Sequence, residues 1–85
     1  MQNNALQVFD RLFRELKFEE VLDNYALVVV YPEGVPSVRL DYVMTTGEGK
    51  QLQGGAPLPN NVFPIEDTWR DVRRLRAKLV LLRGV

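Results

Sequence analysis

Three acidic residues near the end of the first predicted helix are the first candidates for catalytic chemistry. Glu19, Glu20 and Asp23 supply carboxylates, and paired carboxylates can hydrolyse glycosides or hold a hard cation. Glu19 and Glu20 are adjacent, so their side chains diverge by about 100° around a helix. No calcium-type loop accompanies them. We therefore interpret these residues as solvated surface charge.

The composition excludes most other catalytic arrangements. The chain has no histidine and no cysteine, and Ser37 is its only serine, so Ser-His-Asp and Cys-His sites, disulfides and structural zinc are not expected. Residues 47–50 read Gly-Glu-Gly-Lys and resemble a phosphate-binding loop in composition alone. Such a loop has four residues between its first glycine and the Gly-Lys pair, whereas here there is one. We expect a hairpin turn there, no enzymatic activity and no cofactor or metal.

A row of basic residues on the last predicted helix is the strongest candidate for a binding site. Arginine presents a planar fork that fits carboxylate or phosphate oxygens. The net charge is zero and the pI is about 6.2, which favours a protein partner with an acidic surface over nucleic acid. A merely solvated helix face is the alternative. The row consists of Arg70, Arg73, Arg74 and Lys78, at three- and four-residue spacing.

Apolar residues beside this row complete the predicted binding surface. Trp69, Val80 and Leu81 are candidates to stay uncovered by the rest of the fold, because the turn of residues 79–82 is apolar all round. Leu58 and Phe63 lie in the connector before the helix. Exposed apolar residues flanked by arginine are typical of the centre of a protein interface. The alternative is that the connector folds over this turn and buries it.

The elements that must position these residues follow from periodicity. Residues 3–22 predict an amphipathic helix, with a break near Lys17 as an alternative. Residues 25–31 are apolar throughout, which favours a central strand buried on both faces. Residues 37–44 alternate between apolar and polar, and the short polar strand 50–53 suits an edge.

The final helix is predicted over residues 64–82, after an irregular connector at 54–63 that is rich in glycine and proline. The fold class is therefore α+β: a single two-layer domain of order α-β-β-β-α, with a three-stranded antiparallel meander packed against two helices. The predicted buried seam of the final helix comprises Ile65, Trp69, Val72, Leu75, Leu79 and Leu82.

Charge is divided along the chain. Residues 1–49 carry four basic and eight acidic groups, a net charge of −4, and residues 50–85 carry seven basic and three acidic groups, a net charge of +4. Opposite charges could join two copies, so a self-associating homodimer is one alternative.

The N-terminus lacks a signal peptide and no apolar run could span a bilayer. We expect a cytoplasmic protein without membrane contact.

Together these features predict a small non-enzymatic protein-binding module of the inhibitor, immunity or adaptor type, which acts by covering a partner. The order of elements is similar to that of small bacterial immunity and inhibitor proteins, a likeness of layout alone. A homodimeric structural subunit and, less favoured, a nucleic-acid accessory protein are the alternatives.

Overall fold

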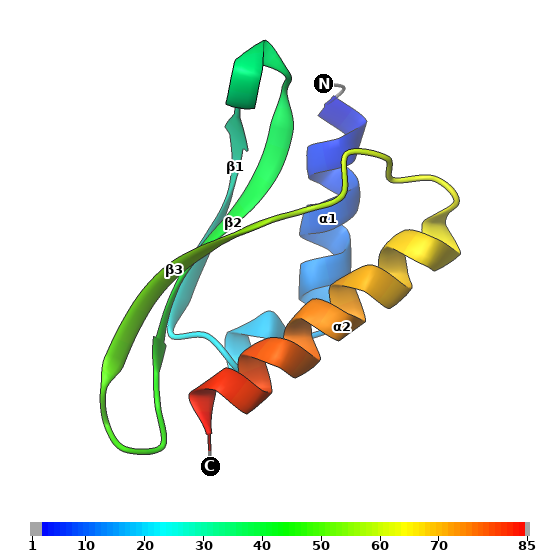
Figure 1. The fold of residues 1–85 in the computed structure, drawn as a ribbon. Coiled ribbons are helices and arrows are strands. Elements are labelled where there is room, and N and C mark those ends of the chain that lie inside the picture. Colours follow the sequence, from blue (N-terminus) through cyan, green and yellow to red (C-terminus); the bar gives the residue numbers. More distant parts are fainter. Residues whose placement is uncertain (1–2, 85) are drawn as a thin grey trace.

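The chain has two α-helices and a three-stranded antiparallel sheet in the order α-β-β-β-α, which confirms the predicted fold class (Figure 1). The computed structural model of the protein describes residues 3–84. Both helices lie on the same side of the sheet, so the molecule has two layers. The elements are α1 (Asn3–Glu15), the 3-10 turn η1 (Phe18–Glu20), β1 (Asn24–Val30), the 3-10 turn η2 (Pro32–Gly34), β2 (Ser37–Thr45), β3 (Gln51–Pro57) and α2 (Ile65–Arg83).

The first helix is shorter than the predicted range of 3–22 and ends at Glu15, so the break near Lys17 is the correct alternative. Lys17 adopts a left-handed conformation with φ of 54°. This conformation ends the helix and turns the chain back on itself. Phe18 is consequently buried and stacks on Phe13, with ring centroids 3.9 Å apart.

The sheet has the order β1-β2-β3, so β2 is the central strand. The predicted central position of residues 25–31 is wrong, because short connections pair each strand with the one before it and leave β1 at an edge. β3 is the other edge, as expected. It is longer than predicted, since Gly54, Gly55, Ala56 and Pro57 extend the strand into the predicted connector.

The register decides which side chains meet the helices. Leu40 lies opposite Leu27 on β1 and Ala56 on β3, and directly opposed residues share one face. Val38, Leu40 and Met44 of β2 are buried on this face. The other face carries Arg39 and Asp41 and is covered by neither helix (Figure 1).

The buried side of α2 differs from the predicted seam. Ile65, Trp69 and Leu82 are 39%, 37% and 53% exposed, whereas Thr68 and Val72 are buried. In Figure 1 the start of α2, drawn in yellow, extends beyond α1. The core comprises Ala5, Phe9, Leu12, Phe13, Phe18, Val21, Leu22, Val38, Leu40, Met44, Leu58, Val62, Val72 and Leu79.

Candidate protein-binding surfaces

Interactions at both ends of α2, the helix that carries most of the predicted site, fix its position. Glu66 and Asp67 lie in the first turn of α2 and Arg83 in the last, which matches the helix dipole. Gly84 follows with φ of 70°, a left-handed value that favours glycine. The N–H of Gly47, in the β2–β3 loop, donates a hydrogen bond of 2.9 Å to the carbonyl oxygen of Arg83. The end of α2 is thus held against the sheet.

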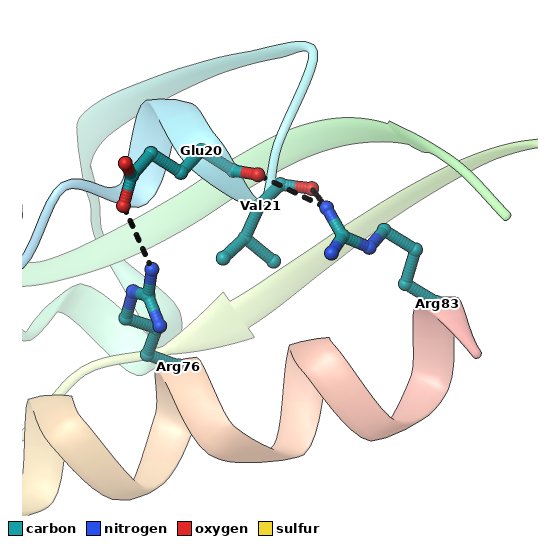
Figure 2. A network of polar contacts seen from close by, with 4 residues as sticks. All are labelled: Glu20, Val21, Arg76 and Arg83. Atoms are coloured by element: carbon teal, nitrogen blue, oxygen red, sulfur yellow. Dashed lines mark hydrogen bonds and ion pairs between the residues drawn. The ribbon is translucent and has the colours of Figure 1, made fainter. Parts of the chain in front are cut away.

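Two arginines of α2 point towards η1 rather than into solvent (Figure 2). Arg83 Nη1 donates to the carbonyl oxygens of Glu20, at 3.0 Å, and Val21, at 3.5 Å. Arg76 Nη2 donates to Glu20 Oε1 at 3.4 Å. The acidic and basic parts of the chain therefore meet within one copy, and these two arginines hold the fold together.

A cluster of exposed large apolar side chains lies at the start of α2. Phe63 is 55% exposed, and Ile65 and Trp69 are exposed by more than a third. The guanidinium carbon of Arg73 lies 4.6 Å from the centroid of the Trp69 ring, a cation–π contact that orders both side chains. We call Phe63, Ile65, Trp69 and Arg73 the Trp69 surface.

The other predicted site residues on α2 form a separate surface. Successive helical residues are about 100° apart, so Leu81 points about 120° and Arg74 about 140° around the helix from Trp69. Leu81 is 81% exposed. Arg70 Nη2 donates to Asp67 Oδ1 at 2.6 Å. We call Arg70, Arg74, Lys78 and Leu81 the basic outer face.

Leu58 belongs to neither surface, because its side chain is only 5% exposed. This corrects its assignment as a partner-binding residue. The connector directs Leu58 and Val62 into the core and Phe63 outwards. A shallow groove of about 320 Å³ remains beside α2, lined by Pro57, Leu58, Pro59, Asp71, Val72, Arg74, Leu75 and Lys78.

The sequence predicts one binding surface, whereas the structure distributes the predicted residues of α2 over two exposed surfaces. Phe63 and Arg73 of the predicted set join the Trp69 surface, together with Trp69, which the sequence placed both in the seam and among the uncovered apolar residues, and Ile65, which was expected only in the core. A further signal supports the position of Trp69: Arg73 follows it by four residues, a spacing that brings two side chains together on a helix.

The acidic residues and the glycine loop have structural roles. Glu20 pairs with Arg76, and Asp23 Oδ2 accepts a hydrogen bond of 2.5 Å from Thr45. Within residues 3–84 there is no group of three side chains suited to bind a metal. Residues 47–50 form the β2–β3 hairpin loop, where the N–H of Thr46 donates to the carbonyl oxygen of Lys50 at 2.7 Å.

The uncovered sheet face carries one close ion pair. Arg39 Nε donates to Asp41 Oδ1 at 2.6 Å. This hydrogen bond from a cation stabilises the carboxylate and lowers the pKa of Asp41 below its ordinary value. On the helix side, burial is the main cause of a raised pKa at Tyr25.

Comparison of the chain with models of protein families, with curated proteins and with solved structures finds no match. Among the described residues, neither helix has the length and apolar character needed to cross a membrane.

Proposed function

We propose that this protein is a small binding module, of the inhibitor, immunity or adaptor type, that acts by covering the surface of another protein without turnover. The observation that carries the proposal is the Trp69 surface. Three large apolar side chains, of Phe63, Ile65 and Trp69, are exposed within one short segment, and Arg73 is stacked on the tryptophan. Tryptophan and arginine are the residues most enriched among those that dominate binding energy at protein interfaces.

The charge around this cluster favours an acidic partner. The guanidinium of Arg73 lies over the Trp69 ring, and guanidinium N–H groups can donate to a carboxylate. Arg74 and Lys78 extend the positive charge around the helix, while Arg70 is paired with Asp67. The partner we expect has an apolar recess for Phe63 and Trp69 with carboxylates at its rim.

A capture experiment with matched baits tests this function. Wild-type protein, Phe63→Ala/Arg73→Ala and Arg74→Ala/Leu81→Ala are immobilised, and retained proteins are quantified by mass spectrometry. The two double variants remove the same kinds of side chain from the two surfaces of α2. We expect a protein that wild type and the second variant retain and that the first variant loses at least tenfold. Equal retention by both variants, or loss with the second alone, contradicts the proposal.

A further inference from the structure

The edge strand β1 has a composition that its place in a single copy does not explain. Asn24–Val30 contains no charged residue, no proline and no glycine. In the described part of the chain only β2 pairs with it, and one of its faces lies on the uncovered side of the sheet. Long uncharged edge strands present unpaired backbone groups that recruit another strand, and natural proteins usually block them with charge or proline.

The hydrogen bonds of the sheet identify the free backbone groups. Leu58 N–H donates to Val38 O at 3.0 Å. Backbone direction alternates along an antiparallel strand, so the even-numbered residues of β2 face β3 and the odd-numbered ones face β1. The bond of 2.9 Å from Asp23 N–H to Val43 O agrees with this assignment.

The residues of β1 opposite those odd positions are Asn24, Ala26, Val28 and Val30. The backbone groups of Tyr25, Leu27 and Val29 consequently point away from the sheet, because they occupy the alternate positions. These three residues form the free edge of β1.

The opposite edge of the sheet is blocked. By the same alternation the outward positions of β3 are Gln51, Gln53, Gly55 and Pro57. Pro57 has no N–H to donate, and Gly55 provides no side chain to pack on an added strand. The two edges therefore differ, and β1 is the one able to accept a strand.

We propose that β1 of a second copy of this chain pairs antiparallel with β1, with the two-fold axis at Leu27, to form a continuous six-stranded sheet. In this register Tyr25 lies opposite Val29 of the second copy, so every outward N–H meets a carbonyl. The strand is its own complement: Tyr25 covers Val29, which is 38% exposed, and Ala26 lies opposite Val28 on the other face. Aromatic and β-branched residues are favourable cross-strand pairs.

The flank of α1 beside this edge is compatible with self-pairing. A groove of about 490 Å³ runs between α1 and β1, lined by Leu6, Gln7, Asp10, Arg14, Tyr25, Ala26 and Leu27. Arg14 Nη2 and Asp10 Oδ2 are 3.1 Å apart and ion-paired, so the flank has no excess of either charge. A neutral groove faces its own copy without like-charge repulsion, and its apolar residues become covered.

Sedimentation velocity at low and high salt tests the dimer. We expect wild type to have about twice the 9.8 kDa mass of one chain, at either salt concentration, because the contacts are apolar and backbone-mediated. Ala26→Lys/Val28→Lys is expected to be monomeric, since lysines then oppose each other across the two-fold axis. Ala26→Lys/Val28→Glu is expected to remain dimeric, since each introduced lysine then opposes a glutamate.

The matched control is Gln51→Lys/Gln53→Lys, which places two lysines on the same face at the blocked edge and is expected to leave the dimer intact. Circular dichroism melting confirms that each variant is folded. Wild-type protein that stays monomeric over a wide range of concentration overturns the proposal. A monomer that binds an extended peptide at β1 instead of a second copy also overturns it. Monomers from both double-lysine variants, or dimers from both, also overturn it. The result is independent of the proposed function, because that rests on α2.

Discussion

At the scale of single residues, Arg83 shows how a charged side chain near the end of α2 stabilises the fold. Arg83→Met keeps the apolar stem and removes the hydrogen bonds to the carbonyl oxygens of Glu20 and Val21. We expect the free energy of unfolding to fall by about 1.5–3 kcal/mol, the usual range for a hydrogen bond from a charged group. Urea unfolding measures it. Arg74→Met on the basic outer face is the control, with an expected change below about 0.5 kcal/mol; equal losses would contradict the assignment.

The ring of Tyr42 leaves no room for a side chain at Gly54, which lies directly opposite Tyr42 on the neighbouring strand. A Cβ atom added at Gly54 would come within 2.5 Å of the Tyr42 hydroxyl oxygen. Gly54→Ala should therefore lower the free energy of unfolding by about 1–3 kcal/mol, the range for an overpacked site. In a Tyr42→Leu background the same change should cost less. An undiminished cost in that double-mutant cycle would show that the ring is not the cause.

The ion pair between Arg39 and Asp41 gives a pH dependence of known sign. The pKa of Asp41 is lowered in the folded state by the hydrogen bond from Arg39. The pair therefore stabilises the fold above the pKa that Asp41 has when unfolded, and this contribution is lost as the pH falls through the folded-state pKa. Arg39→Gln should raise the pKa of Asp41, as followed by the carboxyl carbon shift in an NMR titration. An unchanged pKa would contradict the pairing.

At the scale of elements, the sequence predicted the order of the two α-helices and three strands but not the two 3-10 turns or how α2 is rotated. Spacing alone allows a buried line through Ile65, Trp69 and Val72. The actual buried line passes through Thr68, Val72 and Leu79. Arg76 also faces inwards, since Glu20 pairs with it. That pairing joins segments far apart in the sequence, and no local pattern predicts it.

This rotation is testable with two residues that the spacing places in the same seam. Val72→Ala should lower the free energy of unfolding by about 2 kcal/mol, because Val72 is fully buried and the change removes apolar atoms and leaves a cavity. Ile65→Ala should cost less than about 1 kcal/mol, although it removes more atoms, since Ile65 is already 39% exposed. Thermal unfolding of both variants measures these losses. A larger loss of stability from Ile65→Ala than from Val72→Ala would favour the predicted seam over the observed rotation of α2.

The unbroken apolar run of β1 predicts a strand that is buried on both faces. The run is real, but the short hairpins place the strand at an edge. Pairing of two copies through β1 would make the strand central in the larger sheet. The pattern then describes the assembly rather than the single chain.

At the scale of the whole molecule, the protein is thin. Its extents are 39 × 27 × 15 Å, as expected for one sheet covered by helices on one side. A small two-layer domain buries little surface, so contact with a second copy or a partner would add stability. The Trp69 surface lies on α2 and the free edge on β1. A dimer through β1 would present two Trp69 surfaces, and a partner with repeated sites would bind it with increased avidity.

The measurement that most directly tests the central claim is calorimetric titration of the captured partner with wild-type protein and with Phe63→Ala. Phe63 is 55% exposed, so the variant should fold as wild type does. We predict a dissociation constant at least tenfold higher for the variant, equivalent to about 1.4 kcal/mol of binding free energy. Equal affinity of the two proteins would contradict the claim that the Trp69 surface is where this module binds.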